Sequence, residues 1–114
     1  MLKGIDITET IVYTSTNDTG EEKTKFYIGN VSNRDKLKIF SEAINADGTM
    51  NQAKLQDKTF DIIKAGIKKI VNLGGKDYST ITDEIIDSLQ LTVVVELMSK
   101  IIEFNFAGAT EIKN

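Results

Sequence analysis

Three acidic residues are the strongest candidates for acid–base chemistry in this sequence. Asp83, Glu84 and Asp87 are spaced so that Asp87 shares a helical face with the other two. General acid catalysis would require one of these carboxyl groups to be desolvated so that its pKa rises. No neighbouring feature of the sequence indicates such burial, and acidic residues are common in the first turn of a helix. We interpret the three residues as a solvated helix start.

The side chains on which most enzymes depend are absent. The 114 residues include no histidine and no cysteine. This excludes imidazole bases, thiolate nucleophiles, disulfides and the usual zinc ligands, and it leaves the serine residues without a base for the usual hydrolase triad. We therefore predict a protein that is not an enzyme, with no catalytic residues, no metal site and no cofactors.

Two glycine-containing segments differ from known ligand-binding loops. Gly74-Gly75-Lys76 lacks the earlier glycine and the final Ser or Thr of a phosphate-binding loop, because Ile70 and Asp77 occupy those positions. Residues 45–48 are similar to part of a calcium-binding loop, but alanine and lysine stand where the first and last ligands would be. We predict a helix end at the first segment and a turn at the second.

Composition and charge indicate a single globular domain. Hydrophobic residues make up 40% of the chain and charged residues 27%, values typical of globular proteins. The 14 basic and 17 acidic side chains are interspersed, which argues against nucleic acid as the main partner because phosphate binding needs a concentrated positive patch. The sequence has no signal-peptide pattern and no run of 18 apolar residues. We expect a cytoplasmic protein that contacts no membrane.

The beginning of the chain alternates between apolar and polar residues with the period of a β-strand. The apolar positions of this strand are Ile5, Ile7, Ile11 and Tyr13. Phe26 and Ile28 share one face of a second strand, and turn-forming residues fill the loop between the two. Such a hairpin needs helices on its apolar face. We therefore predict one α+β domain over residues 1–114, with a β-hairpin in residues 1–31 packed against three to four α-helices in residues 32–114.

Short helices are predicted on either side of a longer one. Ser32 or Asn33 is a candidate cap for the first short helix, and Ser79 or Thr82 for the second. The apolar stripe of the first short helix consists of Leu37, Phe40, Ala43 and Ile44.

The longer amphipathic helix is predicted to run from residue 55 to residue 73. The Gly-Gly pair would end it, and Gly66 within it would mark a close contact with a neighbouring element. The loop that follows, residues 74–80, is the predicted hinge of the molecule. Movement there would expose the apolar surface of the last helix.

The last predicted helix, residues 91–106, is apolar around most of its circumference. This breadth exceeds the single arc that a surface helix needs, so the helix should be buried on more than one side. Two interpretations remain open: the helix forms a protein-interaction face, or it is buried beneath the hairpin and the longer helix. The residues predicted for the interaction face are Val94, Leu97, Met98, Ile101, Ile102 and Phe104.

Several short patterns occur in a characteristic order along the chain. They are Lys23-Thr24 after an acidic turn, Ile86-Asp87-Ser88-Leu89, Glu96-Leu97 in an aliphatic helix, Ile101-Ile102-Glu103, and Lys113-Asn114 at the end. Together they resemble the tail assembly chaperones, small proteins encoded in the morphogenesis clusters of tailed phages and prophages. The resemblance covers most of the chain.

The resemblance implies a non-enzymatic role in phage tail assembly. A protein of this family would bind the helical tape measure protein, keep its apolar surfaces from aggregating, and help recruit tail tube proteins. An amphipathic partner helix fits an apolar groove with a polar rim, and the last helix would line that groove or an interface in a homo-oligomer. Two alternatives stay open: a head–tail connector or other minor virion structural protein, and a small nucleic-acid-binding regulator.

Overall fold

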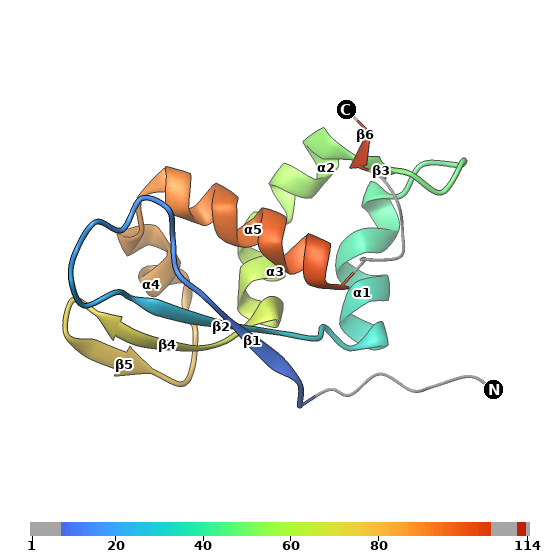
Figure 1. The fold of residues 1–114 in the computed structure, drawn as a ribbon. Coiled ribbons are helices and arrows are strands. Elements are labelled where there is room, and N and C mark those ends of the chain that lie inside the picture. The colour runs from blue at the N-terminus through green and yellow to red at the C-terminus, as the bar shows by residue number, and fades with distance from the viewer. Residues whose placement is uncertain (1–7, 106–111, 114) are drawn as a thin grey trace.

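A computed structural model describes residues 8–105 and 112–113 of the protein, which form an α+β fold (Figure 1). The predicted fold class is therefore confirmed. In chain order the elements are β1 (Thr10–Tyr13), β2 (Lys25–Gly29), α1 (Asn33–Phe40), the 3-10 helix η1 (Ser41–Ala43), β3 (Met50–Asn51), α2 (Gln52–Asp57), α3 (Thr59–Gly66), β4 (Ile67–Leu73), β5 (Lys76–Tyr78), α4 (Asp83–Ser88), α5 (Leu91–Asn105) and β6 (Ile112–Lys113). The predicted strand positions Ile5 and Ile7, together with Phe106 and Asn114, lie outside the described residues.

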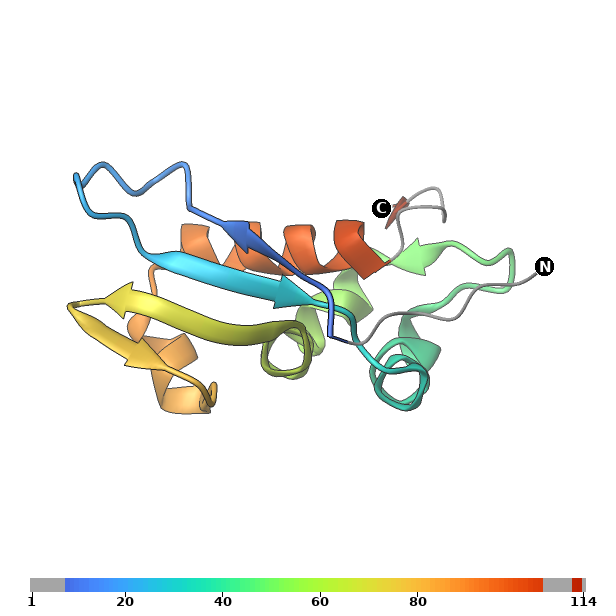
Figure 2. The same ribbon diagram turned by 60° about the horizontal axis from the view of Figure 1, so that its bottom comes forward.

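Four of the strands form one antiparallel sheet in the order β1-β2-β4-β5, while β3 and β6 pair in parallel elsewhere. Helix α5 runs along one face of the larger sheet, as the two views show (Figures 1 and 2). On that face the side chains form two rows across the strands, Ile11–Ile28–Ile67 and Tyr13–Phe26–Ile70–Tyr78. The other face carries Val12, Tyr27 and Lys69, and it is turned away from α5 (Figure 2).

The long helix predicted over residues 55–73 is wrong. The chain forms two short helices, α2 and α3, and enters β4 at Ile67. The pairing of β4 with β2 skips Lys68, which is the extra residue of a β-bulge. Because of this bulge, Ile67 and Ile70 both point into the core although they are three residues apart, a spacing otherwise typical of a helix. The part predicted to be helical, residues 32–114, therefore also contributes strands.

Gly74 and Gly75 join β4 to β5 in a tight turn and do not end a helix. Their φ angles are 60° and 82°, and a positive φ at both central residues is what a type I′ hairpin turn requires. Residues 76–78 then pair with β4 as a strand. The predicted hinge is therefore wrong for residues 74–78, because hydrogen bonds of the sheet hold this hairpin.

Two of the candidate helix caps are confirmed. The hydroxyl of Ser32 accepts a hydrogen bond from the N–H of Asp35 at 3.2 Å, at the start of α1. The hydroxyl of Thr82 accepts one from the N–H of Ile85 at 3.3 Å, at the start of α4. Both contacts satisfy a backbone donor that has no partner within its own helix.

The apolar face of α1 differs from the predicted stripe. Leu37 is 71% exposed and Ile44 also faces solvent, whereas Ile39 and Ala43 are buried. Ala43, which lies in η1, is buried as predicted, whereas Ile39 takes the place of Leu37 on the side of α1 that faces the core. Packing of α1 against α3 selects this arrangement. The side chain of Phe40 lies outside the described residues.

Helix α5 occupies the centre of the hydrophobic core. Five of the six residues predicted for an interaction face are buried there, namely Val94, Leu97, Met98, Ile101 and Ile102. Phe104 is half-buried and packs against the same core. This arrangement corresponds to the second interpretation of the sequence, burial beneath the sheet and α3. A partner could reach most of these side chains only if α5 moved.

The predicted close contact at Gly66 is confirmed. This glycine ends α3 where that helix crosses α5, and a Cβ added to it would lie 2.8 Å from Cγ1 and 2.9 Å from Cδ1 of Ile101. The absent side chain therefore lets the two helices pack closely. Among the described helices, none is long and apolar enough to cross a membrane.

Candidate protein-binding groove

A partly open groove of about 560 Å³ lies between the corner formed by α2 and α3 and the first half of α5. The side chains that α5 contributes to it are Leu91, Val94, Val95 and Met98. Their spacing is that of a single helical stripe covering two turns. This stripe faces the corner between α2 and α3, and the space between them forms the groove.

Large apolar side chains are exposed around this groove. Leu91 is 76% exposed, Val95 is 53% exposed, and Phe60 at the start of α3 is 37% exposed. All three line the same groove, and the buried Val94 and Met98 form its floor. Single exposed apolar residues are normal on a protein surface, but a gathering of them around a concave site is typical of a binding surface.

The corner between α2 and α3 shapes the opposite wall. The side chain of Asn51 caps α2 by accepting a hydrogen bond from the N–H of Lys54 at 3.1 Å. At Lys58 the backbone leaves helical geometry, with φ of −103° and ψ of 11°, so α3 sets off in a new direction. This change of direction brings Phe60 to the groove.

Polar groups surround the apolar floor. Gln52 and Gln56 of α2 line the groove, together with Asp57 at the end of the same helix. Thr59 turns its hydroxyl back to the carbonyl oxygen of Gln56, to which it donates a hydrogen bond at 2.7 Å. The groove thus combines an apolar floor with amide and carboxylate groups at its edge, the combination that fits an amphipathic helix.

Only part of this site is predicted from the sequence. Of the six residues predicted for an interaction face, Val94 and Met98 line the groove. Leu91, Val95 and Phe60 were missed, although the breadth of apolar residues in α5 was a signal that pointed to Leu91 and Val95. That breadth shows that a second side of α5 is apolar, but it does not show whether that side is covered. The answer depends on where α2 and α3 lie.

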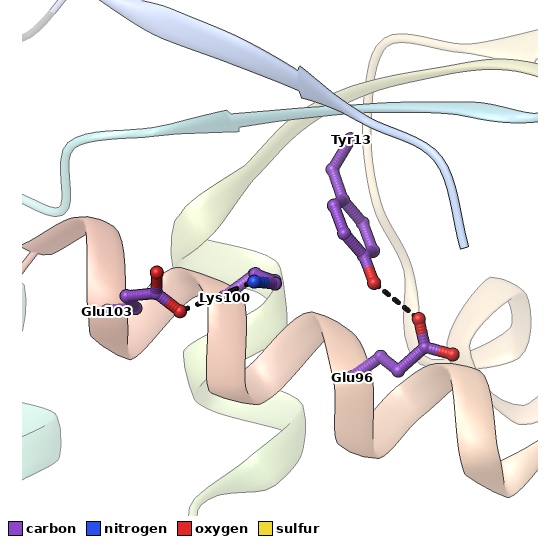
Figure 3. A network of polar contacts seen from close by, with 4 residues as sticks. All are labelled: Tyr13, Glu96, Lys100 and Glu103. Atoms are coloured by element: carbon purple, nitrogen blue, oxygen red, sulfur yellow. Dashed lines mark hydrogen bonds and ion pairs between the residues drawn. The ribbon is translucent and has the colours of Figure 1, made fainter. Parts of the chain in front are cut away.

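A separate cluster of hydrogen bonds on another side of α5 centres on Glu96. Its carboxylate accepts a hydrogen bond from the hydroxyl of Tyr13 (Figure 3). The side-chain amide of Asn17 donates another. Ser15 donates a further hydrogen bond at 2.9 Å, and the backbone N–H and hydroxyl of Thr16 donate at 3.3 Å each. These contacts fasten the loop between β1 and β2 to α5.

The cluster shifts the pKa values of both of its titratable groups. The hydrogen bond from Tyr13, followed by those from Ser15, Thr16 and Asn17, lowers the pKa of Glu96 below its ordinary value of 4.5. Burial and the adjoining carboxylate raise the pKa of Tyr13 to about 12. Both shifts favour the ionised glutamate beside the neutral tyrosine at pH 7. We interpret this pair as a structural contact that holds the loop on α5, because the donors to Glu96 within the described part of the chain come from the loop or from β1.

A second carboxylate organises the other end of the same loop. Asp18 accepts hydrogen bonds from the N–H of Thr24 at 2.8 Å and from the N–H of Gly20 at 3.1 Å. These backbone donors lower the pKa of Asp18. The acidic turn between the two strands therefore serves to hold the loop in shape.

The three acidic residues first considered for catalysis are not brought together with other functional groups. Asp83 forms an ion pair with Lys64 at 2.8 Å, and Glu84 and Asp87 are exposed. Within residues 8–105 and 112–113, no group of three or more acidic side chains is arranged to hold a metal ion. The solvated helix start predicted from the sequence accords with this placement.

Comparison with known protein families, curated proteins and solved structures finds no match to this chain. The interpretation of the groove therefore depends on its own geometry.

Proposed function

We propose that this protein is a non-enzymatic binding protein that holds an amphipathic helix of a partner protein in the groove between α2, α3 and α5. The observation that supports this proposal is the gathering of three exposed apolar residues, Phe60, Leu91 and Val95, around one concave site. A helix laid beside the stripe of α5 would bury these side chains, each worth about 1.5–3 kcal/mol when fully removed from water.

The shape of the groove favours a helix over an extended peptide. Its walls are themselves helices, and the stripe on α5 has the spacing with which one helix presents ridges to another. The side-chain amides of Gln52 and Gln56 stand where the polar flank of a bound helix would lie. An extended peptide would instead require a free strand edge that forms hydrogen bonds with its backbone N–H and C=O groups. No strand borders this groove.

The resemblance to tail assembly chaperones supplies a specific partner for this proposal. The bound helix would be a segment of the tape measure protein, shielded during tail assembly in the cytoplasm of the host cell. In this role the groove is the interaction surface. The buried residues of α5 stay in the hydrophobic core. The chaperone would protect apolar stripes of its partner by covering them with its own.

Co-expression with a tape measure protein, the partner that the proposal names, tests it. Wild-type protein should keep that partner soluble in a complex that light scattering of the purified sample detects. Leu91→Asp places a charge in the groove and should weaken binding roughly tenfold or more, the equivalent of about 1.4 kcal/mol. Leu37→Asp is the matched control, because Leu37 is exposed to a similar extent on α1 and lies outside the groove.

The outcomes separate the alternatives. If Leu91→Asp binds as well as the wild type, the groove is not the binding site. If the wild type leaves the partner insoluble, the chaperone role is wrong. An assembly chaperone should also be missing from purified virions, so its presence there would favour a minor structural protein. DNA binding that weakens steeply as salt rises would favour a regulator.

A further inference from the structure

We propose that β1 pairs with β1 of a second copy of this chain, forming a twofold-symmetric dimer with one continuous eight-stranded sheet. The inference is independent of the groove, because β1 and the groove lie against different sides of α5.

The two edges of the sheet differ in how they are protected. Strand β5, at one edge, has only three residues, carries Lys76 and Asp77, and uses the Asp77 carboxylate to accept a hydrogen bond from the N–H of Asn72 at 2.9 Å. Short length and charge are the usual devices that keep an edge strand from pairing. Strand β1, at the opposite edge, has neither charge nor proline, and its Ile11 and Val12 are 41% and 52% exposed.

Symmetry restricts the register of such a pair. A twofold axis that makes two edge strands antiparallel must be perpendicular to the sheet, so the helix-covered faces of both copies lie on one side. Two residues that lie opposite each other on the paired strands must then point to the same face of the sheet. With the axis at Val12, this residue faces its own copy on the open face, and Ile11 faces Tyr13 of the second copy on the helix side. Both are pairs of β-branched or aromatic residues, which stabilise antiparallel strands.

Charges beside β1 suit this arrangement. Helix α5 runs antiparallel to β1, because Glu96 contacts Tyr13 whereas Asn105 donates a hydrogen bond at 3.3 Å to the carbonyl of Gly29, the partner of Thr10. Lys100 lies near the Tyr13 ring, with Nζ 5.8 Å from the ring centroid, and Glu103 follows one turn later (Figure 3).

The twofold axis therefore brings complementary charges together. It carries the two α5 helices past each other in opposite directions, so Lys100 of one copy approaches Glu103 of the other. Within one chain the same two residues form an exposed ion pair at 3.4 Å, which can be shared across the interface. This complementarity favours a second copy over an unrelated extended peptide as the partner of β1.

Substitution at the axis tests the dimer directly, because the wild-type chain has no cysteine. Val12→Cys should form a disulfide-linked dimer under mild oxidation, since facing residues of an antiparallel pair lie within the Cα separation that a disulfide spans. Leu37→Cys, on the exposed surface of α1, should form no disulfide-linked dimer under the same conditions. Equal cross-linking of the two variants would overturn the proposed register.

Sedimentation measurements over a concentration series provide the second test. The wild type and Val12→Thr should dimerise, whereas Val12→Lys places two like charges at the axis and should weaken association roughly tenfold or more. Lys100→Glu should also weaken the dimer, and the double variant Lys100→Glu with Glu103→Lys should restore it. A wild-type protein that stays monomeric throughout, or a dimer that Val12→Lys leaves intact, would overturn the proposal. Leu91→Asp should leave the dimer unchanged, which separates this result from failure of the groove.

Discussion

Gly66 at the end of α3 lies directly against the side chain of Ile101 in α5. A Cβ at position 66 would lie within 3.0 Å of three side-chain carbon atoms of Ile101, closer than atoms of a packed core tolerate. The contact joins the helix that precedes β4 to the helix that covers the sheet, so it sets how near the two central helices of the core can approach.

Gly66→Ala should therefore destabilise the protein by about 1–3 kcal/mol, the usual cost of overpacking a core. Urea unfolding measures the change in the free energy of unfolding. Combining it with Ile101→Ala provides a double-mutant cycle, in which the double variant should lose less than the sum of the two single losses. Strict additivity would show that the two residues do not interact.

Glu96→Gln should destabilise the protein at pH 7 and remove part of its sensitivity to acid. The folded state lowers the pKa of Glu96, so the ionised carboxylate adds stability that is present above the unfolded-state pKa and is lost as pH falls through the folded-state pKa. The difference in unfolding free energy between wild type and variant should shrink as pH falls below about 4. A difference that stays constant between pH 7 and pH 3 would show that the ionised carboxylate of Glu96 does not stabilise the fold.

Tyr13→Phe should change the alkaline side of the stability profile. The pKa of Tyr13 is raised to about 12 in the folded protein, so its contribution is fully present below the unfolded value near 10 and is lost as pH rises through the folded value. Wild type should therefore lose stability relative to Tyr13→Phe between roughly pH 10 and pH 12. Ultraviolet absorbance of the tyrosinate, compared between the two proteins, provides an independent reading of the same pKa.

Gly75→Val should destabilise the β4–β5 hairpin by about 1–2 kcal/mol, because a residue with a Cβ resists positive φ. A Cβ at this position meets no atom within 4 Å, so the loss would report backbone conformation alone. Gly74→Asn is the matched control and should be nearly neutral, since Asn-Gly is the favoured pair for a type I′ turn. Thermal unfolding of the two variants distinguishes them, and equal losses would contradict the assigned turn.

Local patterns were sufficient to predict several parts of this fold. The α+β class followed from a strand period early in the chain and a helical period later, and Ser32 and Thr82 were identified as candidate caps from their type and position. The broad apolar surface of α5 predicted burial on more than one side, and Gly66 stood out as a residue without a side chain in an amphipathic segment. In each case the signal lies within a few residues of the feature that it predicts.

The sequence by itself thus determined the fold class, the helix caps and the apolar character of α5, because propensity, capping and periodicity are local properties. Tertiary structure alone decided that Ile67 and Ile70 belong to a strand, because the bulge at Lys68 is defined by pairing with β2, about 40 residues away in the chain. It also decided which apolar side of α5 is covered. The side facing the sheet and α3 became core, while the side with Leu91 and Val95 was left open because α2 and α3 diverge at Lys58.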